Sequence, residues 1–159
     1  MKSSCQVHLN KLKEMLPNVR SAFAAKAGDP LLAAILQSIS IGLSPVKGVG
    51  RFKRYSDTYV EAMLHGAYRQ FDKKQRPVNL YLSGAMLGAG TASPNMTGTR
   101  ISFRHYLADI HNAQGAGKSK VIRHFLPTNS GEEFSRTIMS PIYSMLQKLV
   151  SEEVARQNQ

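Results

Sequence analysis

Cysteine and long apolar runs are scarce in this chain of 159 residues. Cys5 is the single cysteine, which excludes a disulfide within the chain and a cluster of thiolate metal ligands. No window approaches the roughly 18 consecutive apolar residues that a membrane-spanning helix requires, and no apolar run follows Lys2 as it does in a secretion signal. We therefore expect neither a membrane protein nor a secreted precursor.

Acidic residues are also few. Ten Asp and Glu stand against 21 Lys and Arg, which gives a formal net charge of +11. The excess lies mid-chain, with +5 over residues 42–76 and +4 over residues 100–124, whereas residues 125–159 carry −1. This bias favours nucleic acid or an acidic protein surface as a neighbour, because cations near polyphosphate gain by releasing counterions. A basic surface that serves only solubility is the alternative.

Residue sets for catalysis or metal binding are missing as well. The five histidines show no HExxH spacing and have no cysteine partners, and no GxSxG nucleophile motif occurs. Residues 112–119 end in Gly-Lys-Ser like a phosphate-binding loop, but Asn112 stands where that motif requires glycine. A helix-like segment precedes them, where the motif requires a buried strand. We therefore predict that the protein is not an enzyme and that it binds no cofactor or metal.

The length and the 42% of apolar residues fit a single domain, 1–159. Within it we distinguish a helical N-terminal part (5–42), a basic extended loop (43–54) and an α+β part (55–159). The predicted fold class is α+β, in which a small antiparallel sheet packs with several helices and a long helix ends the chain.

Apolar residues recur at intervals of three and four, which predicts amphipathic helices over residues 5–27, 31–41, 58–71 and a long last helix that starts at 130–133. Pro17 is expected to kink or divide the first of these helices. Pro141 predicts a kink in the last helix, whose apolar stripe comprises Phe134, Ile138, Ile142, Met145, Leu149 and Val154. Asp29 and Thr58 are expected to begin the second and third helices. Gly42 is expected to end the second helix, which should be buried either in the core or against another subunit. Shorter elements are predicted as helical turns at 83–87 and 106–113, strands at 78–82, 100–105 and 121–126, and a turn at 93–95.

A glycine-rich basic loop is the most informative stretch. Pro45, Gly48 and Gly50 prevent a regular element there, and the four cations of residues 44–54 occur without an acid. A second basic loop without an acid spans 114–120. Loops of this kind bind a partner, stay disordered until assembly, or are simply solvated. The candidates for contact with a neighbouring subunit or with DNA are Lys47, Arg51, Phe52, Lys53, Arg54, Lys118, Lys120 and Arg123.

Four segments share their order with one family. They are Gly42 to Tyr59, which joins a Gly-Leu-Ser-Pro start to the basic loop, then RPVNLYLSGAML (76–87), YLADIHNAQGAG (106–117) and RHFLPTNSGEEF (123–134). Together they resemble the tail-completion or head-tail joining proteins of tailed bacteriophages, which are related to the phage virion morphogenesis proteins.

The resemblance implies a structural virion protein of the phage neck, assembled in the host cytoplasm. Its partners would be the portal or adaptor, the tail proteins and copies of itself in a ring of 6 or 12 subunits, with DNA as a possible neighbour in the channel. A head-to-tail ring needs two different complementary patches on each subunit, and the apolar helix 31–41 and the long loops are the candidates. The alternative hypothesis is a free basic nucleic-acid-binding protein.

Overall fold

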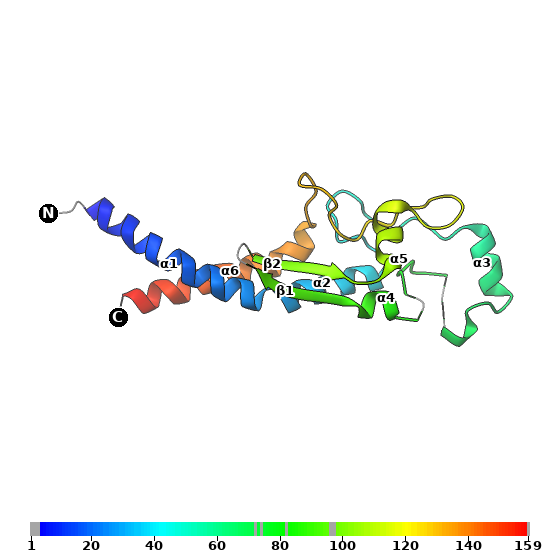
Figure 1. The fold of residues 1–159 in the computed structure, drawn as a ribbon, viewed down its shortest axis with the longest axis horizontal. Coiled ribbons are helices and arrows are strands. Elements are labelled where there is room, and N and C mark those ends of the chain that lie inside the picture. Colours follow the sequence, from blue (N-terminus) through cyan, green and yellow to red (C-terminus); the bar gives the residue numbers. More distant parts are fainter. Residues whose placement is uncertain (1–3, 72, 74, 82, 96–97, 159) are drawn as a thin grey trace.

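The structure, a computed structural model, describes residues 4–71, 73, 75–81, 83–95 and 98–158, with side chains from Met15 onward. The molecule is elongated, with both ends of the chain at one extremity and helix α3 at the other (Figure 1). The elements are α1 (Ser4–Lys26), α2 (Gly28–Ser40), α3 (Asp57–Leu64), the 3-10 turn η1 (Arg69–Phe71), α4 (Ala85–Gly88), β1 (Gly90–Asn95), β2 (Gly98–Phe103), α5 (Tyr106–Asp109), the π-helical turn η2 (Ile110–Gln114) and α6 (Arg136–Gln157). The predicted α+β class is confirmed.

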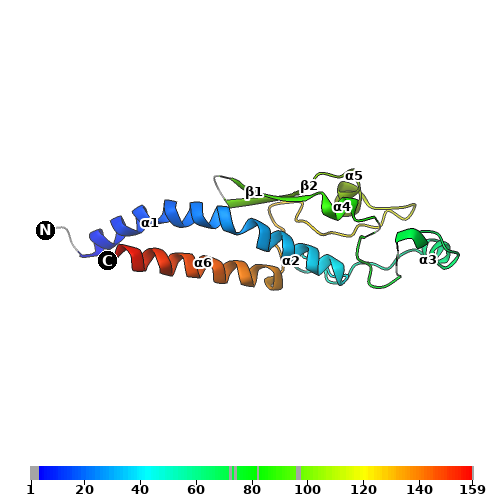
Figure 2. The ribbon, with the colours of Figure 1, turned by 90° about the horizontal axis from the view of Figure 1, so that it is seen from below.

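Helix α2 lies between two layers. The antiparallel hairpin β1–β2 covers one side, and α6 runs along the other side and continues beside α1 (Figure 2). The start of α2 touches the hairpin closely, since a Cβ atom on Gly28 would stand 2.9 Å from the Ala92 Cβ. The Thr99 hydroxyl donates to the Ala24 carbonyl at 2.9 Å and fastens the same junction. Small side chains therefore let helix and hairpin approach each other.

The core is one apolar cluster around α2. Ile35, Ile39 and Phe125 are fully buried, and Ile142 on α6 is 2% exposed. The expected burial of helix 31–41 is confirmed, and its partners lie in its own chain. This burial corrects the idea that the apolar face of that helix supplies a ring patch, because the face is already occupied.

The second helix ends as its glycine predicts. Gly42 has φ +79°, and its N–H donates to the Ile39 carbonyl at 3.0 Å. The Leu43 N–H donates to the Ser38 carbonyl at 3.0 Å, so the two bonds form a Schellman motif. The start of α2 differs from the prediction that Asp29 begins it. Ala27 occupies the cap position, and Asp29 lies inside the first turn.

Helix α3 starts earlier and ends earlier than predicted. Ser56 is its N-cap, and the side chain accepts from the Tyr59 N–H at 3.3 Å. The helix stops at Leu64 because Gly66 and Tyr68 both take positive φ, at +89° and +66°. Residues expected to extend the helix instead form η1.

Other predicted elements are shifted or wrong. Residues 78–81 and 122–126 form no strand, and Leu82 lies outside the described residues. The predicted turn at 93–95 belongs to β1, whereas the predicted strand at 100–105 is confirmed over 100–103 as part of β2, and residues 104–105 lie outside it. The last helix begins at Arg136, with Ser135 as its cap, and the predicted turns at 83–87 and 106–113 are confirmed as α4 and as α5 with η2.

The prolines do not divide the long helices. Pro17 and Pro141 each lie within an uninterrupted helix. The α6 stripe is confirmed at Ile138, Ile142 and Leu149, but Glu153 is buried in place of Val154. The Glu153 carboxylate accepts from Arg156 at 2.7 Å and from the Asn18 amide on α1 at 3.2 Å, so it joins the two long helices. None of the helices in the described part of the chain has the length and apolar character to cross a membrane.

Candidate functional site

The basic loop is closed by its own backbone. Leu43 and Arg51 form an antiparallel bridge, the Ser44 N–H donates to Gly50 at 2.8 Å, and the Phe52 N–H donates to Gly42 at 3.0 Å. Gly48 and Gly50 turn the chain between them with φ of +83° and +74°. The absence of a regular helix or strand from this loop, predicted from its proline and glycines, is confirmed.

The same loop is anchored to the segment before α6. The Lys47 N–H donates to the Glu133 carbonyl at 2.8 Å, and the Ser135 N–H donates to the Pro45 carbonyl at 2.7 Å, on either side of a bridge between Val46 and Phe134. The buried Ser44 hydroxyl donates to the His124 carbonyl nearby. The loop is therefore bonded to the rest of the chain through its backbone, which argues against the alternative that it stays disordered until assembly.

The charges of the loop point outward. Lys47 pairs with Glu133 at 3.0 Å, and Arg54 stands 4.0 Å from Asp57; all four side chains are well exposed. Arg51 and Lys53 are exposed too. Phe52 is the exception, because it is 7% exposed and belongs to the core. We therefore correct its assignment from contact residue to core residue.

Arg123 is also internal. The side chain is 6% exposed, its Nε donates to the Lys53 carbonyl at 3.2 Å and its Nη2 to the Arg54 carbonyl at 3.3 Å. The guanidinium lies 5.2 Å from the ring centre of Tyr55. Burial lowers the pKa of Arg123, and the nearby tyrosines oppose that shift. Arg123 holds the end of the basic loop in place, and this corrects its assignment as a contact residue.

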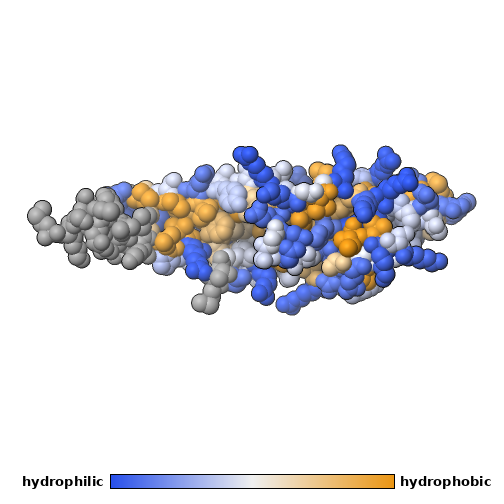
Figure 3. All heavy atoms as spheres, turned by 90° about the horizontal axis from the view of Figure 1, so that it is seen from above, coloured by the Kyte–Doolittle hydropathy of each residue, from blue (hydrophilic) through white to orange (hydrophobic). Residues whose placement is uncertain are grey.

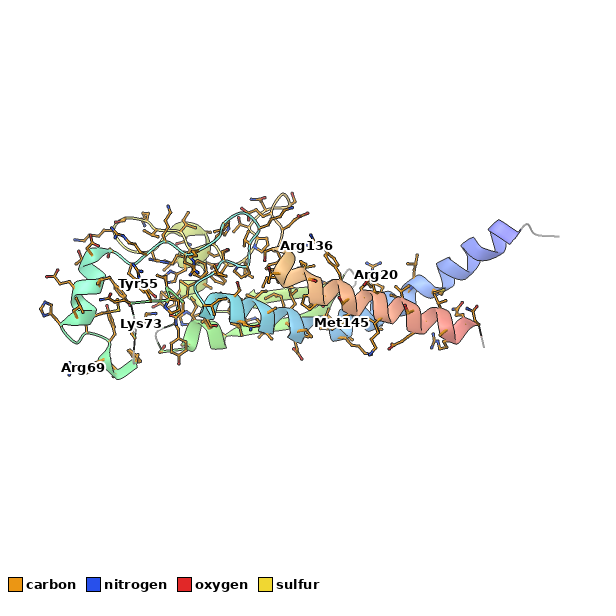
Figure 4. The ribbon with its side chains drawn as sticks, turned by 180° about the vertical axis from the view of Figure 1, so that it is seen from behind. Arg20, Tyr55, Arg69, Lys73, Arg136 and Met145 are labelled. Carbon is orange, nitrogen blue, oxygen red and sulfur yellow. The ribbon has the colours of Figure 1, made fainter. Side chains whose placement is uncertain are left out.

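A row of tyrosines connects α3 to the rest of the molecule. The ring centres of Tyr55 and Tyr59 are 4.9 Å apart, and those of Tyr59 and Tyr68 are 5.1 Å apart and stacked. Lys73 lies 5.1 Å from the Tyr55 ring on the same side of the molecule as α3 (Figure 4). Since no residue of α3 is fully buried, these ring contacts are a main link between the helix and the core.

The environment of these groups shifts their pKa values. Burial, and then the charge of Arg123, lower the pKa of Lys73 to about 8, and its Nζ donates to the Asn79 Oδ1 at 2.9 Å and to the Tyr81 carbonyl. Burial raises the pKa of Tyr55 to about 12. Burial also lowers the pKa of His111, followed by the charges of Arg123 and Lys73. Positive charge and low solvation are therefore combined at this position.

These residues line a half-open cavity of about 880 Å³, which we call the tyrosine groove. α3 and the turn after it line it together with α5 and the loop at 116–119. Among the described residues that line it are three Lys or Arg, namely Lys73, Lys118 and Arg123, and no Asp or Glu. Its aromatic lining residues are Tyr55, Tyr59, Tyr68, Tyr81, Tyr106, His105 and His111. The groove is thus suited to an anion that carries flat apolar groups.

A second hollow of about 670 Å³ adjoins the groove, and Tyr55 lines both. Arg51, Arg54 and Arg76 line this second hollow, where Asp57 also lies. Long hydrophilic side chains project widely from the half of the molecule away from the N-terminal helix, with apolar surface between them (Figure 3). The predicted cations therefore divide between two neighbouring hollows and the open surface.

The loop that carries Lys118 and Lys120 turns tightly. Ala116 and Val121 form a bridge, and Gly115 has φ +86° with the Lys120 backbone packed against it. Lys118 lines the groove; Lys120 is exposed and does not line it. The π-helical turn η2 precedes this loop and no helix follows it, so it lacks the strand and helix that a phosphate-binding loop requires.

Asn112 has an internal role. The side chain is 9% exposed, its Oδ1 accepts from the Phe125 and Leu126 N–H groups at 2.7 Å each, and its Nδ2 donates to the Leu126 carbonyl at 3.1 Å. The Asn112 amide thus makes the hydrogen bonds to the backbone of residues 125–126 that a neighbouring strand would otherwise make. Among the residues that the structure describes, no group of three or more His, Cys, Asp or Glu could hold a metal ion.

The sequence prediction found Lys118 and the basic loop but missed the tyrosines and Lys73. Tyr55 and Tyr59 are four residues apart, and this spacing was a usable signal that they share a face. The turn that brings Tyr68 back against Tyr59 leaves no such signal in the sequence. Comparison with models of protein families, with curated proteins and with solved structures finds no match for this chain.

Proposed function

We propose that the protein is a structural subunit of the neck of a tailed bacteriophage, in a ring between the portal or its adaptor and the tail. One observation carries the proposal: the four segments that resemble the head-tail joining proteins meet in one half of the molecule. The Arg123 side chain donates to the carbonyls of Lys53 and Arg54, and the Arg123 backbone N–H donates to the His111 carbonyl at 2.7 Å. Segments distant in sequence thus form one unit, as motifs of a common fold should.

The segment 76–87 joins the same unit. A Cβ atom on Gly42 would stand 3.0 Å from the Pro77 Cβ, and Val78 and Leu80 are buried in the core beside Phe52. In the proposal this half presents the basic surface to a neighbouring subunit or to DNA. Its work is binding, and no bond is made or broken.

A second contact surface supports the idea of a ring. Tyr143, Val150 and Val154 on α6 are exposed by 56%, 41% and 41%, and Leu16 on α1 is exposed by 63%. Their spacing along α6 puts the first three on one face. A head-to-tail ring needs two different patches per subunit, and this apolar stripe and the basic half lie at different parts of the molecule.

Native mass spectrometry and electron microscopy of the purified full chain test the proposal. A closed ring of 6 or 12 copies is the expected result, together with filled heads and separate tails when the gene is inactivated in its phage. A strict monomer that never enters virions contradicts it.

Charge reversal separates assembly from folding. The triple variant Arg51→Glu, Lys53→Glu, Arg54→Glu is expected to stay folded, because the loop is held through its backbone, and to lose ring formation. Arg20→Glu, Lys26→Glu, Arg136→Glu is a control with the same charge change outside the loop. Loss of the folded circular-dichroism spectrum in the first variant, or equal loss of rings in both, removes the specific role of the loop.

The runner-up is a free nucleic-acid-binding protein, and the net charge of +11 favours it. It predicts binding of the monomer to random duplex DNA, with log K falling linearly against log salt in proportion to the phosphates contacted. A monomer without measurable affinity for either duplex or single-stranded nucleic acid at low salt eliminates this function.

A further inference from the structure

The charge of the tyrosine groove favours an anionic ligand. Lys73, Lys118 and Arg123 line it, and no Asp or Glu stands among its lining residues in the part of the chain that the structure describes. Arg123 is only 6% exposed and is bonded to two backbone carbonyls. Lys73 donates to the Asn79 Oδ1 and the Tyr81 carbonyl and keeps a third Nζ–H, so Lys73 and Lys118 are the cations that can meet a ligand. Lys73 is half-buried and its lowered pKa reports poor solvation, which a bound anion would relieve.

The aromatic rings indicate flat apolar groups on the same ligand. Tyr106 is 71% exposed and stacks on His105 with ring centres 5.0 Å apart, and Tyr81 is 46% exposed. Both line the groove, as do the buried Leu80 and Met86. Exposed rings beside cations match a polymer that alternates bases with phosphates, because every base has a face that stacks on tyrosine.

The shape of the groove favours unpaired bases over a duplex. It is concave and lies between α3 and the turn after it on one side and α5 with the loop at 116–119 on the other. A duplex keeps its bases stacked and paired inside, where rings within a cavity cannot reach their faces. Extended single-stranded segments bring both bases and phosphates to the walls.

We propose that the tyrosine groove binds a short single-stranded nucleic-acid segment, with bases against Tyr106 and Tyr81 and phosphates at Lys73 and Lys118. This site is separate from the ring contacts proposed above and does not depend on them. Arg123 acts here as a positioning residue that fixes Tyr55 and the segment leading to α3.

Fluorescence anisotropy with a labelled twelve-nucleotide oligo(dT) tests the proposal on the full chain at low salt. The single strand is expected to bind more tightly than a duplex of the same length, and an oligo(U) of the same length tells whether DNA and RNA are distinguished. Tyr106→Ala is expected to weaken binding about tenfold, the loss of one stacked base. Ile41→Ala, which removes a 53% exposed apolar side chain outside the groove, is the control and is expected to leave oligonucleotide binding unchanged.

The second part of the experiment compares Lys118 with Lys120, which lie on the same loop. Lys118→Ala is expected to lower the slope of log K against log salt by about one unit, the loss of one phosphate contact, whereas Lys120→Ala leaves the slope unchanged. Duplex that binds as well as single strand, equal effects of Tyr106→Ala and Ile41→Ala, or displacement by poly-glutamate at the concentrations at which oligo(dT) binds would overturn the proposal.

The Tyr106→Ala variant also separates this proposal from the ring. Native mass spectrometry of the variant is expected to give the same oligomer as the original chain. If oligonucleotide binding fails while rings form, only the groove assignment is wrong; if binding holds while no ring forms, only the neck assignment is wrong.

Discussion

The helical end and the loop half of the molecule are held together by different means. Helices α1, α2 and α6 join through apolar side chains packed at helical spacing, with a polar link at Glu153. The loop half has few regular elements, and side-chain groups of Ser44, Asn112 and Arg123 bond its backbone instead. The comparison teaches that many interchangeable contacts secure one region, whereas a few specific bonds secure the other.

The largest effect is expected from the core that the two regions share. Ile35→Ala removes a fully buried side chain and should lower the free energy of unfolding by on the order of 4 kcal/mol, because a cavity remains. Urea denaturation measures this value. Ile41→Ala, at an exposed position of the same segment, is the matched control and should cost less than about 1 kcal/mol. Similar losses in both variants would show that α2 is not the centre of the core.

The second effect concerns the loop half alone. Asn112→Ala leaves the buried Phe125 N–H and the partly buried Leu126 N–H without their acceptor, at a cost of on the order of 3 kcal/mol. Hydrogen exchange should show faster exchange at residues 105–135 than in α1 and α6. Asn129→Ala removes only an exposed bond to the Gly131 N–H and serves as the control. Equally faster hydrogen exchange in both regions would mean that they unfold as one unit, and would contradict the proposed difference between them.

The third prediction uses pH. Lys73 has a pKa of about 8 in the folded chain against 10.5 for the free side chain, so between these values the unfolded chain holds more protons. The free energy of unfolding should therefore rise as pH increases from 8 to 10, where Lys73 loses its charge. Lys73→Gln should remove this rise. Above pH 10, Tyr55 acts in the opposite sense, because its folded pKa is raised to about 12.

Denaturant titrations at pH 8 and pH 10 on both proteins measure the difference. If the free energy of unfolding rises equally in the original chain and in Lys73→Gln, the pH dependence belongs to other groups. That result would contradict the desolvated environment of Lys73.

The smallest effect is expected at the surface of the basic loop. Lys47→Ala removes an exposed ion pair with Glu133 and should cost about 0.5 kcal/mol, less at high salt. A double-mutant cycle with Glu133→Gln measures the pair alone. A coupling energy well above 1 kcal/mol would show that a side-chain pair, and not the backbone bonds of Lys47 and Ser135, anchors the loop.

The helical end was the more predictable region. Its buried stripes at Ile35 and Ile142 follow from the spacing of apolar residues, and Gly42 marked the end of α2. Strand β1 was missed because its small polar residues read as a turn. They are small for a packing reason, since Ala92 lies against Gly28, and such a contact leaves no periodic signal.

The candidate site was predicted only in part. Charge composition located the exposed cations but could not separate them from Arg123, because the partners of that residue are backbone carbonyls, which every residue has. Phe52 was included with its charged neighbours although it faces the core. The tyrosine groove depends on the turn at Gly66, which brings Tyr68 back to Tyr59, and a turn path is not encoded in side-chain spacing.

The anchoring of the basic loop has a consequence for the speed and cost of association. A loop tied by backbone bonds at Ser44, Lys47 and Phe52 has little conformational entropy left to lose when a partner arrives. The attraction of its exposed cations then acts on the rate of encounter with an acidic surface, and that rate should fall steeply as ionic strength rises.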